Sequence, residues 1–180
     1  GGPFRCNQHC ISIDDDINYV AQFDFRVRVP RNTAVELKTV NKGHVRVTGI
    51  TGEFELRNVN GDIEATDIAG SGRAHTVNGP VRVSFRENPR EASSFKTING
   101  EIALSFQPAL AADFRMKTLN GDAWSDFEFR MVPTEPEVSR DGRGFVWRKN
   151  RFTGVRVGAG GPEIRIETLN GPIRLINRGK

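Results

Sequence analysis

The sequence repeats one short motif six times, and this repetition restricts the fold of the 180-residue chain more than any other feature. Each copy runs from a charged or histidine residue through threonine (asparagine once) and an aliphatic residue to an asparagine, which glycine follows directly in five copies. The first five copies are spaced by 18 to 21 residues, and a period of about 20 is typical of a repeat architecture. The motif asparagines are Asn41, Asn60, Asn78, Asn99, Asn120 and Asn170.

Each copy of the motif also predicts a sharp bend between two short strands. Asn-Gly supplies the positive φ that such a bend requires, and alternating aliphatic residues follow it, as in Ile63 and Ala65. A second glycine corner separates the early copies, first at residues 49–52. One turn of the chain is therefore expected to hold two strands and two corners.

The residue types at equivalent positions decide between two arrangements of these strands. Repeated Asn-Gly is ordinarily interpreted as a series of antiparallel hairpins. Hairpins, however, do not explain why the residue types at equivalent positions of the six motifs are alike. If the strands coil in parallel, threonine lies on threonine and asparagine on asparagine, as inward ladders beside an aliphatic core. We therefore predict an all-β fold, a parallel β-solenoid (β-helix) of about six short turns. The threonine column is Thr39, Asn58, Thr76, Thr97, Thr118 and Thr168.

One set of aliphatic residues conflicts with this core. The residue directly before each motif asparagine has the opposite parity to the inward positions that precede it, and a straight strand cannot point both sets inward. Either the chain kinks at the bend, or these residues form an outward stripe that needs cover from another segment or another molecule. They are Val40, Val59, Val77, Ile98, Leu119 and Leu169.

Two segments depart from the repeat. Residues 1–18 are expected to be an N-terminal tail, and residues 19–180 a single solenoid domain. In the tail, Cys6 and Cys10 are a candidate disulfide, which is typical of an oxidising compartment, and the alternative is two free thiols. The step of 50 residues between the last two motifs holds an insert at about 126–160, which predicts an extra β-hairpin.

A further strand is expected over residues 19–29, ahead of the first motif. Phe25, Val27 and Val29 share one parity, charged residues take the other, and Pro30 ends the pattern. Such alternation is typical of a half-buried strand. No apolar run approaches the roughly 20 residues of a membrane-spanning helix, so no transmembrane segment is expected.

The sequence carries no recognisable catalytic or cofactor-binding motif. It lacks Gly-x-Ser-x-Gly, His-Glu-x-x-His and a phosphate-binding glycine loop, so we expect no enzymatic activity, no cofactor and no metal site. Asp62, Glu101 and Asp122 follow Asn-Gly bends and could align along one edge, as the paired carboxylates of glycoside hydrolases do at separations of about 5–10 Å. The alternative is that they are surface charges beside turns.

The residues that precede the threonine column form the candidate binding site. In a solenoid they would stack about 4.8 Å apart on the outer surface, where like charges repel and an anionic glycan, lipid head group or envelope polymer would relieve them. The alternative is a solvated face whose long side chains spread their charged ends into water. Aromatic residues do not interleave this column, which argues against nucleic acid. The basic column is Lys38, Arg57, His75, Lys96 and Lys117.

The segments Phe25–Pro30, Val35–Asn41 and Asn60–Ala65 resemble the toastrack-type adhesin family of bacteria, a domain of unknown function. The resemblance covers roughly residues 20–125 and 160–177. It implies a parallel β-solenoid in a secreted, periplasmic or cell-surface protein, with a role in adhesion or envelope-stress sensing. It implies no catalytic residues.

Three hypotheses about function follow. The leading one is a non-enzymatic structural or binding module at the bacterial cell envelope. The second is a self-assembling filament or surface-layer subunit, a homo-oligomer that stacks through the exposed strand edges at the solenoid ends. The third is a polysaccharide lyase or hydrolase on a β-helix scaffold, which requires clustered acids on one face.

Overall fold

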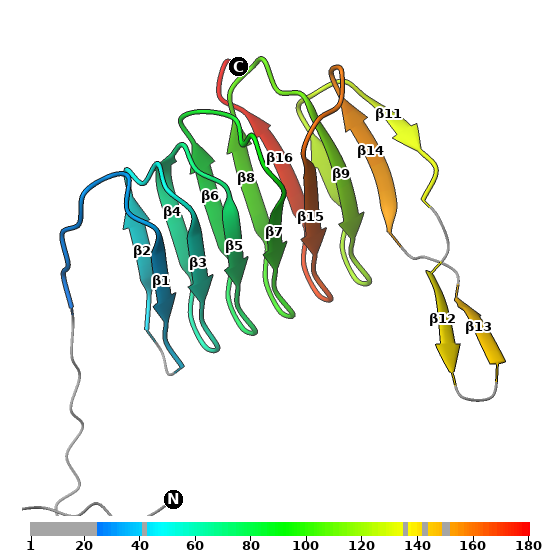
Figure 1. Ribbon diagram of the computed structural model, residues 1–180, viewed down its shortest axis with the longest axis horizontal. Coiled ribbons are helices and arrows are strands. Elements are labelled where there is room, and N and C mark those ends of the chain that lie inside the picture. The colour runs from blue at the N-terminus through cyan, green and yellow to red at the C-terminus, as the bar shows by residue number, and fades with distance from the viewer. Residues whose placement is uncertain (1–24, 41–42, 135–136, 142–143, 149–151) are drawn as a thin grey trace, which may run out of the picture.

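The computed structural model describes residues 25–40, 43–134, 137–141, 144–148 and 152–180, and all regular secondary structure in these ranges is β-strand (Figure 1). Cys6 and Cys10 lie outside the described residues, so the disulfide stays a prediction. The strands are β1 (Val35–Lys38), β2 (Val45–Thr48), β3 (Phe54–Arg57), β4 (Ile63–Ile68), β5 (Gly72–His75), β6 (Val81–Phe85), β7 (Ser93–Lys96), β8 (Ile102–Phe106), β9 (Ala112–Lys117), β10 (Ala123–Ser125), β11 (Phe129–Val132), β12 (Glu137–Asp141), β13 (Gly144–Arg148), β14 (Thr153–Val157), β15 (Glu163–Glu167) and β16 (Ile173–Asn177).

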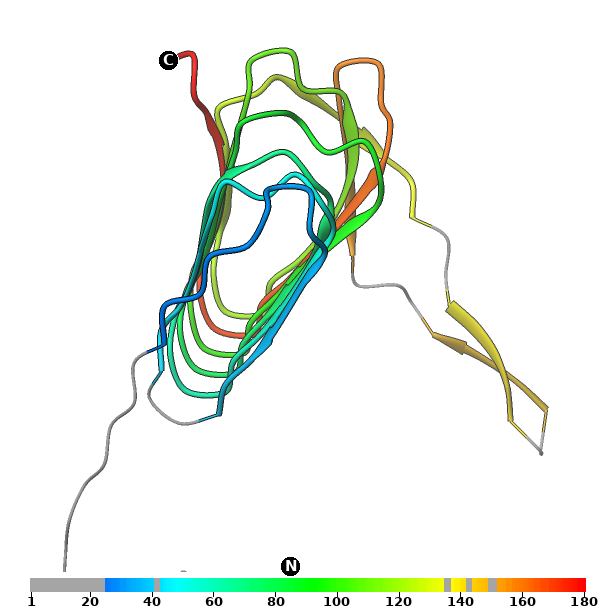
Figure 2. The same cartoon turned by 60° about the vertical axis from the view of Figure 1, so that its left-hand side comes forward.

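Two large sheets face each other across the core (Figure 2). The eight-stranded sheet has the order β1-β3-β5-β7-β15-β9-β14-β11, and the six-stranded sheet has the order β10-β16-β8-β6-β4-β2. Neighbouring strands in them are parallel except where β14 pairs with β9 and with β11. The prediction of an all-β parallel β-solenoid is confirmed. None of the described residues lies in a helix of the length and apolarity that a membrane crossing requires.

Each turn of the solenoid, called a rung below, consists of one strand of the eight-stranded sheet, an asparagine bend and the next strand of the six-stranded sheet. Equivalent residues of neighbouring rungs are paired, as Leu56 is with Ala74 and Arg57 with His75. The bends stack as well, since a parallel bridge joins Asn60 to the asparagine of the next rung. The six rungs are β1–β2, β3–β4, β5–β6, β7–β8, β9–β10 and β15–β16.

The last rung in sequence does not lie at the end of the stack. Strand β15 pairs with β7 on one side and β9 on the other, and β16 lies between β8 and β10. The bridges of Asn170 to Asn99 and to Asn120 show the same order. The order of the rungs in space therefore differs from their order in the sequence at the sixth rung. Because the motifs are nearly alike, this rung fits between two others, and the insert brings the chain back to that gap.

Alternation along each strand fills the space between the sheets. In β8, Ile102, Leu104 and Phe106 are completely buried, while the residues between them are only half-buried. Aromatic side chains occupy the part of the core near the glycine-corner side of these strands. Phe106 stacks on Phe85 with ring centroids 5.0 Å apart and meets Phe114 edge-on at 5.8 Å. Such pairs add to the stabilisation from burial alone.

The threonine column points inward, as predicted. Thr76, Thr97 and Thr168 are at most 2% exposed. Each hydroxyl donates a hydrogen bond to a bend carbonyl of the neighbouring rung, as that of Thr97 does to Gly79 at 2.9 Å. The buried hydroxyls are therefore satisfied, and each one ties two rungs together.

The five motif asparagines that the structure describes instead point outward, so the expectation of an inward asparagine ladder is wrong. Four of the five described amides donate to the amide oxygen of a neighbour, as Asn78 does to Asn60 at 2.8 Å. At three bends the glycine that follows has positive φ: +153° at Gly61, +146° at Gly79 and +149° at Gly171. On the outer side of the bend, the amide hydrogens that the ladder does not use stay in contact with water. They would have no such contact in an aliphatic core.

The aliphatic residues before the asparagines also face outward. Val40, Leu119 and Leu169 are 60%, 57% and 41% exposed, and the other three are half-buried. The conflict in the sequence is therefore resolved by an outward stripe along the bends.

The predicted strand at residues 19–29 is wrong for its described part. Residues 25–29 form no strand, and Phe25 and Val27 are 88% and 76% exposed. An alternating segment becomes a strand only where a neighbouring edge pairs with it. Within the described residues β2 pairs with β4 alone, so its outer edge has no such neighbour. Residues 19–24 lie outside the described ranges.

The insert contains the predicted hairpin and two further strands. Strands β12 and β13 pair antiparallel, with Val138 opposite Trp147, and project from the solenoid (Figure 1). Strands β14 and β11 extend the eight-stranded sheet beyond β9. Arg156 on β14 donates to both carboxylate oxygens of Asp113 on β9, at 2.5 and 2.8 Å, and so holds the pKa of Asp113 below its usual range.

Candidate anion-binding face

The basic column lies in register on the outer face of the eight-stranded sheet, as the sequence predicts. Lys38, Arg57, His75 and Lys96 occupy the same position in four neighbouring strands. Strand β15, however, places Glu167 between Lys96 and Lys117. The column is therefore interrupted by a carboxylate, which the order of the motifs in the sequence does not reveal.

Most cations of this column have an acidic neighbour. Lys38 pairs with Glu36, and Arg57 with Glu55 at 2.5 Å. Lys96 and Lys117 share Glu167, at 3.6 and 3.4 Å. The row is thus largely neutralised, and the repulsion expected between stacked like charges is relieved within the chain itself.

A second basic column lies two residues earlier in β5, β15 and β9, where the sequence does not suggest one. Arg73 on β5 is paired with Ser94 on β7, which is paired in turn with Arg165 on β15, and Arg165 is paired with Arg115 on β9. Arg73 and Arg165 are exposed, and the small, uncharged Ser94 lies between them. Their alignment depends on the inserted rung, so no sequence periodicity could have shown it.

These residues form what we call the basic patch. Arg115 is paired with Glu163 at 2.7 Å, whereas Arg73 forms no ion pair with any residue that the structure describes. Two arginines that flank a small residue suit a planar carboxylate or a phosphate, because guanidinium groups bind these anions with paired hydrogen bonds. The basic patch consists of Arg73, His75, Lys96, Arg115, Lys117 and Arg165.

An aromatic ring lies at the edge of the basic patch. Phe152 is 8% exposed, with the guanidinium of Arg165 4.2 Å and the ammonium of Lys117 5.4 Å from its ring centroid. Phe152 thus accompanies Lys117 at one end of the basic column but does not interleave its other members. Phe152 belongs to the insert, about 35 residues from Lys117 in sequence, so no local pattern links the two. Its ring holds two cations in place without neutralising them.

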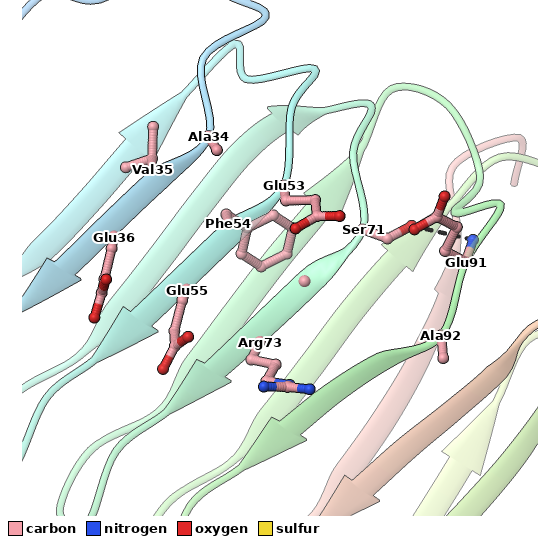
Figure 3. Close-up of a pocket in the computed structure, with 11 residues that line it drawn as sticks. Ala34, Val35, Glu36, Glu53, Phe54, Glu55, Ser71, Arg73, Glu91 and Ala92 are labelled. Carbon is pink, nitrogen blue, oxygen red and sulfur yellow. Dashed lines mark hydrogen bonds between the residues drawn. The ribbon is translucent and has the colours of Figure 1, made fainter.

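The N-terminal half of the same face is acidic instead. A groove of about 580 Å³ lies there, lined by Glu36, Glu53, Glu55 and Glu91 together with Arg73 (Figure 3). These four carboxylates would repel an anion. The anion-binding region therefore begins at Arg73, which borders this groove, and extends from there toward β9.

The environment of His75 couples this patch to pH. Burial, together with the cations of Lys96 and Arg57, lowers the pKa of His75 below its ordinary value of 6.5. The imidazole is therefore neutral at pH 7. In the unfolded chain His75 binds a proton more readily than in the folded protein. The free energy of unfolding should therefore be highest above about pH 6.5, decrease as the pH falls through that value, and become constant below the pKa of His75 in the folded protein.

We expect the affinity of the basic patch for an anion to rise as the pH falls from 7 to 5. A bound anion offsets the cations that suppress protonation of His75, so binding and proton uptake favour each other. Titration calorimetry with a sulfated glycan, which stays ionised over this range, measures the effect. The His75→Gln variant should bind with little pH dependence, and an equal dependence in the variant would contradict the assignment.

The three carboxylates considered for hydrolysis lie in one column but not in adjacent rungs. Pro80 stands between Asp62 and Glu101, and Pro172 stands between Glu101 and Asp122. Each pair is thus about 9.6 Å apart along the axis, two strand spacings. Glu101 is also paired with two arginines, at 3.0 and 3.9 Å. Within the described ranges, no three His, Cys, Asp or Glu side chains are grouped so as to hold a metal ion.

Comparison with known proteins gives no match to a family model, to a curated protein or to a solved structure, so the basic patch is interpreted from its own geometry.

Proposed function

We propose that the protein is a non-enzymatic binding module of the bacterial cell envelope, and that it binds an anionic glycan or envelope polymer on the basic patch. The observation that carries the proposal is the alignment of Arg73, Ser94 and Arg165 across three neighbouring strands. A polymer that runs along the solenoid axis meets a guanidinium at Arg73, at Arg165 and at Arg115. The position at the envelope rests on the resemblance to the toastrack-type family and on the candidate disulfide.

The charge distribution supports a polymer rather than a single small anion. The three guanidinium groups are spread over about 14 Å along the axis, three strand spacings. The patch is open, and each contact is shared with solvent, so one anion gains little from any one arginine. Several linked anions bind more tightly, because each contact after the first is intramolecular.

The test measures binding of the protein to three immobilised polymers: polygalacturonate, poly(glycerol phosphate) and neutral dextran. We expect binding to one or both anionic polymers and none to dextran. Arg73→Gln and Arg165→Gln should each weaken binding by about threefold to fivefold, since an exposed ion pair contributes up to roughly 1 kcal/mol. Arg46→Gln, on the outer face of the six-stranded sheet, is the matched control and should bind normally. Equal loss in all three variants would contradict the assignment of the patch.

A second candidate function, self-assembly through the solenoid ends, is favoured by one observation. In the described part of the chain, β1 pairs with β3 alone and β2 with β4 alone, so the first rung has free edges in both sheets. A cavity of about 550 Å³ opens there onto Val35, Val47 and Ile50. Electron microscopy at high protein concentration tests this: filaments would support it, and discrete particles alone would contradict it.

A further inference from the structure

The outward stripe along the bends is an unusually regular apolar surface. Its residues stand one per rung in six consecutive rungs, and we call them the bend ridge. Because neighbouring parallel strands are about 4.8 Å apart, the ridge is roughly 24 Å long. In spatial order it consists of Val40, Val59, Val77, Ile98, Leu169 and Leu119.

Charges of opposite sign flank the bend ridge on its two sides. The basic column lies on the side of the eight-stranded sheet, two residues before the ridge. Acidic residues lie on the other side, beyond the asparagines. Three rungs carry both charges: Arg57 with Asp62, Lys96 with Glu101, and Lys117 with Asp122. None of these three pairs is an ion pair within the described residues. There the cations bind Glu55 and Glu167, Asp62 binds His44 and Glu101 binds two arginines, whereas no described cation pairs with Asp122.

The spacing of the ridge identifies the partner that fits it. An extended peptide repeats its side chains on one face about every 6.6–6.8 Å, which does not match a 4.8 Å rung. An anionic bilayer would meet the acidic residues along one flank of the ridge. A second solenoid has the same rung spacing, and ladders of identical side chains at this spacing interdigitate in the dry interfaces of cross-β assemblies. We propose that the bend ridge is the contact surface of a homodimer.

The flanking charges fix the orientation of the two copies. A two-fold axis parallel to the solenoid axis places each rung against the same rung of the partner and puts the basic side of one copy over the acidic side of the other. Arg57, Lys96 and Lys117 then face Asp62, Glu101 and Asp122 of the second copy. A two-fold axis perpendicular to the solenoid axis would instead place the basic side of one copy over the basic side of the other. Complementary charges select orientation more than they add affinity.

The dimer is expected to be weak. A ridge one residue wide and about 24 Å long offers less than the roughly 800 Å² per partner of a standard interface. It should therefore form at high protein concentration, or where several copies are held close together on a surface. It should also be closed, because a two-fold contact uses the ridge of both copies.

Disulfide trapping tests the contact and its orientation. In a background with Cys6→Ser and Cys10→Ser, single variants Val59→Cys and Leu119→Cys should each form disulfide dimers under mild oxidation. Ile176→Cys, exposed on the six-stranded sheet, is the control for random collision. Trapping no faster than this control, or dimers formed only when Val59→Cys and Leu119→Cys are mixed, would overturn the proposal.

Charge exchange provides an independent test by sedimentation equilibrium. Lys117→Glu and Asp122→Lys should each weaken the dimer at least about tenfold, because both contacts become repulsive. An equimolar mixture of the two variants should dimerise normally, since the heterodimer restores both contacts. Ile98→Asp should also weaken the dimer at least tenfold. A wild-type protein that is monomeric at every concentration up to about 1 mM, or an Ile98→Asp protein that has lost only binding to anionic vesicles, would overturn the proposal.

Discussion

Replacing Phe106 with alanine is expected to lower the free energy of unfolding by about 3–5 kcal/mol. The side chain is completely buried, stacks on Phe85 and contacts Phe114 and Phe127 edge-on. Phe106 is also paired with Asn177 of the inserted rung, so the loss would loosen two neighbouring rungs. Equilibrium unfolding in urea, followed by far-ultraviolet circular dichroism, measures the effect.

The matched control for this substitution is Phe129→Ala. Phe129 is 53% exposed on β11, and its removal should change the free energy of unfolding by no more than about 0.5 kcal/mol. If Phe106→Ala cost less than about 1 kcal/mol, the aromatic cluster would not be the tightly packed core described above.

Replacing Gly79 with alanine is expected to cost about 3 kcal/mol or more. Gly79 has φ +146°, and a Cβ there would collide with the carbonyl group of Gly61 in the neighbouring rung, whose carbon would be only 2.6 Å away. The oxygen of that carbonyl also accepts the hydrogen bond of Thr76, so the rung cannot move away without breaking it. The same urea measurement gives the loss.

Gly49→Ala separates backbone strain from crowding. Gly49 also has positive φ, +75°, but a Cβ at this position would have its nearest neighbour 3.9 Å away, on the side chain of Asp67. The substitution should cost only the strain of a left-handed residue, about 1–2 kcal/mol. Equal costs at the two glycines would mean that close contact between bends contributes little to the stability of the stack.

The local elements of this fold could be predicted from the sequence, because they depend on local chemistry. Asn-Gly determines the bends, and matched residue types determine which strands are neighbours. The inward direction of Thr97 could be predicted as well, since its small hydroxyl can donate a hydrogen bond to a carbonyl of the neighbouring bend. The asparagines were placed wrongly because an amide ladder forms equally well on either side of a bend, and only contact with water decides between the two.

The spatial order of the rungs could not be predicted. The motif that contains Asn170 is as good a neighbour for Asn99 as the motif that contains Asn120, so similarity alone gives no order. The composition of the candidate site depends on this order of the rungs and could not be predicted either. Glu167 interrupts the basic column, and Arg165 completes the second column, only because β15 enters between β7 and β9. The strand prediction for residues 25–29 is wrong for the opposite reason. The alternation in their sequence is clear, but no strand lies beside them.

The entry of β15 and β16 between earlier strands has a consequence for biosynthesis. Residues 163–177 leave the ribosome some 40 to 80 residues after strands β7 to β10, yet these strands need them as neighbours. Folding during synthesis can add one rung after another only through the fourth rung, β7–β8. The stack beyond that rung cannot be completed until β15 and β16 have been made. A nascent chain arrested before Ile173 would expose the middle of its hydrophobic interior and the unpaired edges of earlier strands, and such surfaces are prone to aggregation.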